Sequence, residues 1–386
     1  MSVSPPPPTS AAAPAAETRV VRPGELSSAE TDAWTRLHRT VPELASPYFH
    51  PAFTRLVAEA RATGGRDDVR VGVTADGFFP FQRSWGGRAT PPGGRLCDYH
   101  GVIAAPGAVR DAAKLLRGCG LRSYAFHMLP PGQATLATTA CDELDDRAGV
   151  RVNLEGGYDA FVARREAAGS KRHRKIAQFR RRMERERGEV TFTWHDSDPE
   201  AWALLIDWKR ARYAATGFCD VLAAPWVRNL LTRCRDAGCT PVESPEDAAD
   251  AGFSGVFCTL RAGGEVVAAH LLLRSGARLH AWFPAYDLDA RQLSPGNVLM
   301  TELLKAAAER GVTAVDLGAG DEPYKADYAT DRFPLRRGVA ETPGAAATLA
   351  AVGRRVRDSL KAHPAGAPAR LAAAWVRPLR ERLSLR

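Results

Sequence analysis

The sequence of 386 residues predicts an α/β fold, and three observations support this prediction. Segments typical of strands alternate with segments typical of helices along most of the chain. Apolar residues make up 45% and charged residues 25% of the chain, as in ordinary globular proteins. In each half, a helix opened by a proline, at Pro51 or Pro225, leads into a run of strands. This repeated order hints at a tandem duplication, and the length allows two domains.

The first half opens with a tail rich in proline and alanine, from Ser4 to Ala16, which is too poor in large apolar residues to form a core. We expect the folded body to begin near residue 18. The expected elements are a strand at 18–22, helices at 27–39 and 51–62, strands at 69–74 and 78–83, a helix at 112–117, and strands at 122–129 and 150–154.

The second half begins with a highly charged helix. The expected elements are helices at 171–187, 197–213, 225–235 and 295–310, with strands at 190–194, 256–261, 265–274, 278–286 and 312–317. Ser197 is followed three residues later by Glu200, which predicts a capping box at the start of the second of these helices.

The cysteines and the N-terminus bear on location. The seven cysteines form no CxxC pair, so we expect free thiols in a reducing compartment. Residues 1–17 lack the basic and apolar regions of a signal peptide, and no run approaches the roughly 20 apolar residues of a membrane span. The expected location is the cytoplasm.

Two successive strands are expected to line a cleft. Both faces of the strand at 265–274 are apolar except at His270, which predicts a central strand. In the next strand Arg278, His280, Trp282 and Tyr286 share one face. A three-residue loop at 275–277 would place His270 opposite Trp282, on the face of His280 and Tyr286. The alternative for His270 is a core histidine bonded to the backbone.

The helix at 295–310 has the clearest boundaries. Ser294 can cap it, Pro295 occupies its first position and Gly311 follows its end. We expect a phosphate-binding site at the start of this helix, formed by the backbone N–H groups of Gly296, Asn297 and Val298 and the positive end of the helix dipole. Arg291 adds positive charge to it. An ordinary connection with a good cap is the alternative.

The strand at 312–317 ends in a run of polar residues and glycines that includes Asp316, Gly318, Gly320, Tyr324 and Lys325. The string Asp-Leu-Gly-Ala-Gly at 316–320 resembles the glycine-rich motif of methyltransferases that bind S-adenosylmethionine. That motif opens its fold, whereas only 66 residues follow Gly320 here. We therefore do not favour a methyltransferase.

The order of these segments resembles the GNAT superfamily of acyltransferases, and in particular its CelD-like, cellulose-biosynthesis-type branch, which is related to the Fem-type peptidoglycan aminoacyltransferases. The resemblance covers about residues 20–345. It rests on the strings FPFQR at 79–83, DYHG at 98–101, GSKRHRKIAQFRRRM at 169–183, PAYD at 284–287, SPG at 294–296 and GDEPYK at 320–325.

The resemblance implies tandem GNAT-like domains, each a mixed, mostly antiparallel sheet flanked by helices, and acyl-CoA (acetyl-CoA) as donor, with no metal. The implied division is a disordered tail at 1–17, domains at 18–155 and 156–340, with the donor site in the second, and a basic helical extension at 341–386. The usual phosphate loop, Arg/Gln-x-x-Gly-x-Gly/Ala, is shortened at 291–297 to a single glycine. Aminoacyl-tRNA, the donor of the Fem-type relatives, is therefore the alternative.

The chemistry of this superfamily is attack of an amine on a thioester, which needs a base, oxyanion stabilisation and protonation of the thiolate. As base we predict Asp316 or His270, and as acid Tyr286 or Tyr324. The predicted donor-binding residues are Arg291, Ser294, Gly296, Asn297 and Val298. The predicted substrate-binding residues are Asp98, Tyr99, His280, Trp282 and Lys325. A structural hydrogen bond is the alternative role for each carboxylate and tyrosine.

The positive charge is concentrated in two stretches. Residues 164–187 hold eleven Lys or Arg against three Glu, and residues 354–386 hold nine against two acids, so the rest of the chain is net acidic despite the overall +9. Ile176, Phe179 and Met183 form an apolar stripe, which predicts a helix packed along one seam. The alternatives for this helix are contact with tRNA or coenzyme A, or contact with a membrane surface. Contact with a membrane surface is also the alternative for the C-terminal stretch.

The predicted function is transfer of an acyl group from acyl-CoA to an amine or hydroxyl of a small-molecule or glycan-type acceptor, in polysaccharide or cell-envelope biosynthesis. Two alternatives remain. One is a Fem-type peptidyltransferase that uses aminoacyl-tRNA, and the other is a non-catalytic, basic nucleic-acid or membrane-surface adaptor on a degenerate GNAT fold.

Overall fold

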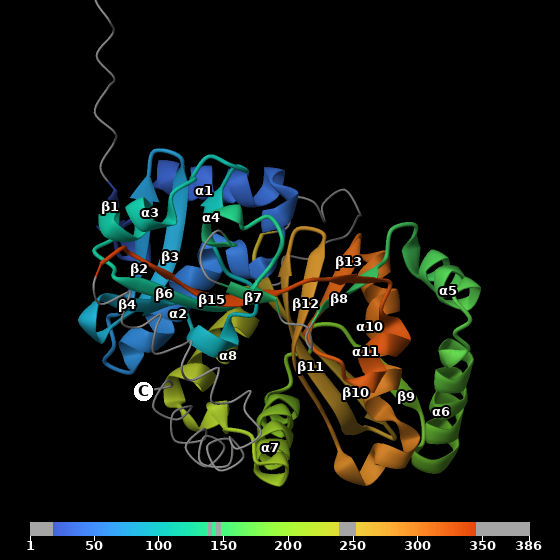
Figure 1. The fold of residues 1–386 in the computed structure, drawn as a ribbon. Helices are drawn as coiled ribbons and strands as arrows, with labels where there is room; N and C mark the ends of the chain where they lie inside the picture. The colour runs from blue at the N-terminus through green and yellow to red at the C-terminus, as the bar shows by residue number, and fades with distance from the viewer. Residues whose placement is uncertain (1–17, 138–140, 144–147, 239–251, 345–386) are drawn as a thin grey trace, which may run out of the picture.

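A computed structural model describes residues 18–137, 141–143, 148–238 and 252–344. It contains two mixed sheets flanked by helices, which confirms the predicted α/β class (Figure 1). The predicted N-terminal tail and all but the first four residues of the predicted C-terminal extension lie outside the described residues.

The first sheet lies mainly in the first half of the chain. Its strand order is β1-β2-β3-β4-β6-β15-β7, and β5 pairs with β3 at one side. The bounds are β1 Arg19–Val21, β2 Val69–Thr74, β3 Gly77–Ser84, β4 Arg88–Thr90, β5 Ile103–Ala104, β6 Ser123–Leu129, β7 Cys141–Glu143 and β15 Arg336–Glu341.

The second sheet has the order β14-β8-β13-β12-β11-β10-β9. Its bounds are β8 Gly149–Asn153, β9 Val190–Thr193, β10 Ser254–Ala262, β11 Glu265–Ser275, β12 Arg278–Tyr286, β13 Ala314–Ala319 and β14 Asp331–Phe333. The predicted bounds of the strands at 69–74 and 278–286 are confirmed to the residue.

The two sheets have the same topology. In each, four strands pair antiparallel, β1 to β4 or β9 to β12, and the fourth then pairs in parallel with β6 or β13. A helix, α3 (Ala112–Gly118) or α10 (Pro295–Glu309), connects each parallel pair, as a parallel crossover requires. The repeated order therefore extends to the strand pairing, which supports the hint of a duplication.

The halves exchange strands. β15, near the C-terminus, crosses to lie beside β6 in the first sheet, as the red strand in Figure 1 shows. β8 comes from the first half but pairs with β13 in the second sheet. The predicted domain boundary near residue 155 therefore does not coincide with a boundary between the sheets.

Helices cover both faces of the second sheet. α5, α6 and α10 lie together on one face, while α7 and α8 pack on the other, where α2 contacts α8 (Figure 1). The remaining bounds are α1 Ser28–Thr40, α2 Pro51–Thr63, α4 Ala134–Ala137, α5 Gly157–Ala167, α6 Arg172–Arg187, α7 Pro199–Thr216, α8 Pro225–Asp236 and α11 Pro323–Tyr328. Across the described ranges, each helix is too short or too polar to cross a lipid bilayer.

The predicted cap of α7 is wrong by one residue. The helix begins at Pro199, and the side chain of Asp198, not Ser197, accepts the backbone N–H of Glu200. Proline is favoured at the first helical position, so the residue directly before it becomes the cap.

The core joins the two halves. One apolar cluster contains Phe53 of α2 together with Phe257 and Leu271 of the second sheet, all almost fully buried. A second cluster lies between the other face of that sheet and α10. It includes Ile176 and Met183 of α6, with Phe179 partly buried against it, so the predicted apolar seam of this basic helix is confirmed.

The predicted register between β11 and β12 is wrong. Ser275 pairs with Arg278, which leaves a two-residue loop with Gly276 at a positive φ of 53°, and His270 lies opposite Pro284 rather than Trp282. A β-bulge interrupts the ladder at Trp282, because Leu271 pairs with Phe283 while Leu272 pairs with Ala281.

The bulge also reverses the alternation of side chains along β12. Leu279 and Ala281 pack in or against the second cluster, whereas Phe283 and Ala285 pack in the first cluster, beside Trp282. The regular alternation predicted for this strand therefore holds only as far as Trp282.

Candidate functional site

The candidate site lies where β12 and β13 separate. The two parallel strands pair only over Arg278–His280 and Ala314–Asp316 and diverge after that. His280 lies opposite Asp316 in this last pair, and Arg151 of β8 lies opposite Asp316 on its other side. Three polar side chains from three strands therefore meet at one level of the sheet.

Asp316 is bonded through one carboxylate oxygen. Its Oδ1 accepts the Tyr99 hydroxyl at 2.7 Å and the Gly318 backbone N–H at 2.9 Å. The chain turns at Gly318, whose φ is 72°, a conformation that favours glycine. Oδ2 lies 4.0 Å from a terminal nitrogen of Arg151. One oxygen of a nearly buried carboxylate thus remains available to a ligand.

His280 lies between Asp316 and Asp98. Its Nε2 lies 2.8 Å from Asp98 Oδ2, and its Nδ1 lies 3.7 Å from Asp316 Oδ1. The imidazole is fully buried, and the rings of Tyr48 and Tyr99 approach it edge-on with centroids at 4.8 and 5.3 Å. Asp98, Tyr99, His280 and Asp316, all predicted site residues, are therefore brought together from both halves.

Burial raises the pKa of Tyr99 well above its usual value, and the negative charge of Asp316 adds to this effect. The Tyr99 hydroxyl consequently stays protonated at any physiological pH and acts as a donor to Asp316. This bond fixes the carboxylate and leaves Oδ2 as the acceptor of a further proton.

A cavity of about 340 Å³ opens beside this group, a volume suited to a small molecule. Tyr99 and Asp316 form part of its wall. Its charged lining residues are Glu43, Arg151, Arg278, Asp316, Asp331 and Arg332. Arg151 also lies over the ring of Phe333, with its guanidinium carbon 4.8 Å from the centroid.

His270 is not part of this group. It is 2% exposed, and burial lowers its pKa to about 3, so it is neutral. It lies opposite Cys258, which packs in the second cluster, whereas His280 contacts Tyr48 on the other face of the sheet. The two histidines therefore do not share a face, contrary to the sequence prediction.

The two tyrosines predicted as acids lie apart from Asp316. Tyr286 is six residues beyond His280 in β12, or about 20 Å along a strand, and its ring lies beside Gly296. Tyr324 packs against the second cluster, and burial raises its pKa to about 12. Neither ring has a contact with Asp316 among the described residues.

Two predicted substrate-binding residues make structural contacts. The buried Lys325 ammonium donates to the Ala319 carbonyl at 2.7 Å and pairs with Glu322 at 2.9 Å, which fixes the turn after β13. The Trp282 indole N–H donates to the Leu96 carbonyl at 3.1 Å, so this side chain joins the halves.

Two of the three backbone N–H groups predicted to bind phosphate at the start of α10 are already bonded within the chain. The Ser294 carbonyl accepts the backbone N–H groups of Asn297 at 3.1 Å and Val298 at 3.2 Å. Val298 is the fourth helical residue, so its N–H makes the first regular helix bond and is not free. The Gly296 N–H remains, and Arg291 is exposed in the preceding 3₁₀ turn, Leu288–Leu293.

Asn297 stabilises the same turn with its side chain. Its amide nitrogen donates to Ser294 Oγ at 2.8 Å, and its backbone carbonyl accepts the Tyr328 hydroxyl at 3.1 Å. These bonds hold Ser294 at its positive φ of 54°.

Sequence reasoning missed Tyr48 and Arg151. Tyr48 lies in a short turn, Pro47–Phe49, with no motif around it. Arg151 is in a strand that was correctly predicted, but its proximity to Asp316 depends on the exchange of β8 into the second sheet. Within the described ranges no group of three His, Cys, Asp or Glu could hold a metal ion.

Residues 170–326 match the model of the acetyltransferase (GNAT) domain family. No curated protein matches the sequence. The matched segment contains α6, α7, α8, α10 and β9 to β13, and thus the divergence of β12 and β13; it ends within α11.

Solved structures share the fold across most of this chain. FemX has a TM-score of 0.53 at 9% identity, covering 86% of this chain and 99% of its own. A conserved protein from Bacteroides thetaiotaomicron has a TM-score of 0.51 at 10% identity, covering 81% and 97%. The C-terminal domain (DUF2156) of a protein described as a lysylphosphatidylglycerol synthetase from Agrobacterium fabrum has 0.50 at 14%, covering 85% and 96%. At such identities the similarity shows the fold alone.

Proposed function

We propose that this chain, in which residues 170–326 match a GNAT acetyltransferase domain, transfers an acyl group from acyl-CoA to an amine or hydroxyl. The observation that carries the proposal is the separation of β12 and β13 beside Asp316, whose free carboxylate oxygen lies at a cavity of small-molecule size. A small-molecule or glycan-type acceptor would enter this cavity, in keeping with a role in polysaccharide or cell-envelope synthesis.

The separated strands suit a long donor with an anionic end. The Gly296 N–H, the dipole of α10 and Arg291 favour phosphate at one end. The Tyr286 end of β12 lies beside Gly296, and His280 lies about 20 Å back along the strand. Between these two points the edge of β12 no longer pairs with β13, so its backbone N–H groups are open to a ligand. An extended arm between these points would bring a thioester to Asp316.

In the proposed reaction Asp316 acts as the base. Its Oδ2 takes the proton of the acceptor nucleophile, which attacks the thioester carbonyl, and backbone N–H groups at the free edge of β12 stabilise the oxyanion. The C–S bond then breaks, and the leaving thiolate takes up the proton that Asp316 received from the nucleophile, which restores the Asp316 carboxylate. Tyr99, which stays protonated, holds Oδ1 and so orients the carboxylate.

Two arginines of the cavity, Arg151 and Arg278, favour an acceptor that carries an anionic group. Arg278 has no ion pair among the described residues, and burial together with the nearby charge of Arg151 lowers its pKa. Two guanidinium groups that repel one another are stabilised by a carboxylate or phosphate between them. The nucleophile of the same molecule would then lie at Asp316.

Replacing Arg278 with Gln is expected to raise KM for an anionic acceptor by about tenfold, because one charged hydrogen bond is lost. The value of kcat and the KM for acyl-CoA should stay near those of the wild type. Steady-state kinetics with matched anionic and neutral amines measures this, with Arg212→Gln on the exposed face of α7 as control. Equal KM values for both amine classes in the wild type would contradict an anionic acceptor while leaving acyl transfer intact.

Thermal unfolding in the presence of acetyl-CoA tests the donor. At a concentration 100 times Kd, a ligand that binds the folded state adds about 2.7 kcal/mol, so the melting temperature should rise on the order of 5 °C. Arg291→Gln should reduce the shift. Five cysteines of the described residues form no disulfide, which fits the reducing cytoplasm that we propose for the reaction.

Aminoacyl-tRNA is the second candidate donor. An open groove of about 500 Å³ at the start of α6 is lined by Lys171, Arg172, Arg174 and Lys175, and the fold is shared with FemX. Within this groove Arg172 pairs with Asp327 at 3.0 Å and Arg174 pairs with Glu166 at 3.1 Å. Further along α6, Arg180 and Arg182 pair with Glu184 and Glu186 at 2.6 Å, whereas Arg181, Arg185 and Arg187 are exposed. Salt-sensitive binding of tRNA, with no effect of acetyl-CoA on melting, would favour this donor.

A further inference from the structure

A second cavity lies in the first half of the chain, at the counterpart of the acyl-transfer cleft. β4 and β6 pair in parallel only over Arg88–Ala89 and Ser123–Tyr124. After Thr90 the chain leaves the sheet, while β6 continues to Leu129. A cavity of about 520 Å³ fills this position. It shares no lining residue with the cavity at Asp316.

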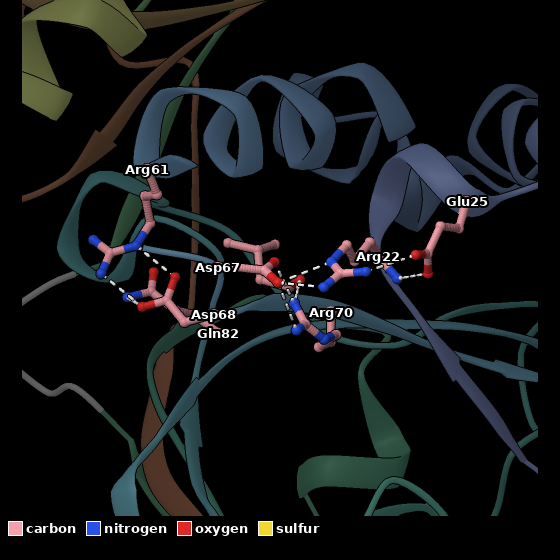
Figure 2. Close-up of polar contacts among 8 residues, drawn as sticks. Arg22, Glu25, Arg61, Asp67, Asp68, Arg70 and Gln82 are labelled. Atoms are coloured by element: carbon pink, nitrogen blue, oxygen red, sulfur yellow. Dashed lines mark hydrogen bonds and ion pairs between the residues drawn. The ribbon is translucent and has the colours of Figure 1, made fainter. Parts of the chain in front are cut away.

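The lining of this cavity is positively charged. It contains Arg61, Arg66, Arg83 and Arg95, and its one acidic residue is Asp68. Figure 2 shows that Arg61 binds both oxygens of Asp68, each at 2.7 Å. Gln82 lies 3.4 Å from the same carboxylate. Asp68 is therefore neutralised within the wall by Arg61, and Arg66 and Arg83 have no ion pair among the described residues.

The neighbouring acid does not compensate them either. Asp67 turns to the opposite side, where it accepts Arg22 at 2.8 Å and Arg70 at 2.9 Å (Figure 2). Arg66 is exposed and has no ion pair among the described residues. Arg83 donates to the Cys119 carbonyl at 3.0 Å, which fixes its guanidinium without removing the charge.

Two buried nitrogen atoms of lining residues have no partner within the described ranges. They are Nη1 of Arg61, which is 2% exposed, and Nε2 of His127. The Arg61 guanidinium also lies over the Trp226 ring, 4.7 Å from its centroid. Buried polar atoms without a partner are uncommon in folded proteins, and both residues line this cavity.

An aromatic side chain stands at the rim. Trp85 lines the cavity and is 93% exposed, in a short turn, Trp85–Gly87, directly after β3. Phe126 lies in the wall. An exposed indole beside a positive cavity offers a stacking face for a planar ring next to a seat for an anion.

We propose that this cavity binds a nucleotide-type ligand, that is, a phosphate-bearing small molecule with a planar ring. Arg66 and Arg83 contact the phosphate, and Trp85 stacks on the ring. The site is separate from the proposed acyl-transfer site, since the two cavities share no lining residue. Free nucleotides and the nucleotide end of coenzyme A have this chemistry in common.

Titration of the full chain with ADP, adenosine, ribose 5-phosphate and coenzyme A, followed by tryptophan fluorescence and calorimetry, tests the proposal. ADP is expected to bind at least about tenfold more tightly than adenosine or ribose 5-phosphate, because each lacks one of the two contacts. Arg66→Gln and Trp85→Ala should each weaken this binding about tenfold. Both side chains are exposed, so folding should be preserved.

Arg36→Gln on the exposed face of α1 is the matched control and should leave binding unchanged. If coenzyme A rather than ADP loses affinity on Arg66→Gln and Trp85→Ala, the site exists and its ligand is coenzyme A. The proposal is overturned if neither ligand is affected by these two variants, or if ADP affinity falls only on Arg291→Gln, which would place the nucleotide at α10. Absence of ADP and coenzyme A binding at millimolar concentration overturns it as well.

Discussion

Asp316→Asn is expected to lower kcat/KM for acyl transfer by about 10²- to 10⁴-fold, the usual contribution of a general base. Asparagine keeps an oxygen that accepts the Tyr99 hydroxyl and the Gly318 N–H, so the local geometry should persist. It cannot take a proton from the acceptor. The loss should therefore appear in kcat, with the KM for acetyl-CoA little changed. Release of free thiol from acetyl-CoA measures both constants.

Asp321→Asn is the matched control, since Asp321 is exposed and pairs with Arg332 at 3.1 Å. Its kcat should stay close to that of the wild type. A folded Asp316→Asn protein with undiminished kcat would exclude Asp316 as the base. The non-catalytic adaptor would be the better interpretation if Asp316→Asn left the biological function intact while replacement of Arg180, Arg181 and Arg182 with Gln abolished it.

Acidification is expected to unfold this protein. Burial lowers the pKa of five histidines: His38 and His127 to about 4, His50 and His270 to about 3, and His100 well below its usual value. All five are neutral in the folded state, whereas in the unfolded chain they take up protons near pH 6.5. Their contribution to stability is therefore complete above pH 6.5 and is lost as the pH falls toward 4.

The expected size of this effect is large. At pH 5 each of these histidines lowers the free energy of unfolding by about 2 kcal/mol. Their sum approaches the whole free energy of unfolding of a typical domain, about 5–15 kcal/mol. Urea unfolding followed by circular dichroism at pH 7.5, 6.5, 5.5 and 5.0 measures the free energy of unfolding. His270→Gln should reduce the loss between pH 7.5 and 5.0 by about 2 kcal/mol. A free energy independent of pH over this interval would contradict the prediction.

The sequence alone determined most of the elements and part of the site. Apolar periodicity and proline or glycine boundaries located α1, α2, α8, α10 and every strand of the second sheet except β14 to within a few residues. These signals are local, so they survive in any tertiary context. Asp316 was predicted from its place near the end of an apolar strand, whereas Asp98 and Tyr99 were predicted from the string DYHG, through the family resemblance.

Only the tertiary structure decided which strands pair and which side chains meet. An apolar pattern records that a strand is buried but not which strand lies beside it, so the exchange of β8 and β15 left no local signal. A bulge likewise adds one unpaired residue, Trp282, without changing composition, and reverses every side chain beyond it. The contact of Tyr99 with Asp316 and the separation of His270 from His280 follow from these two long-range features, which depend on packing between halves of the chain.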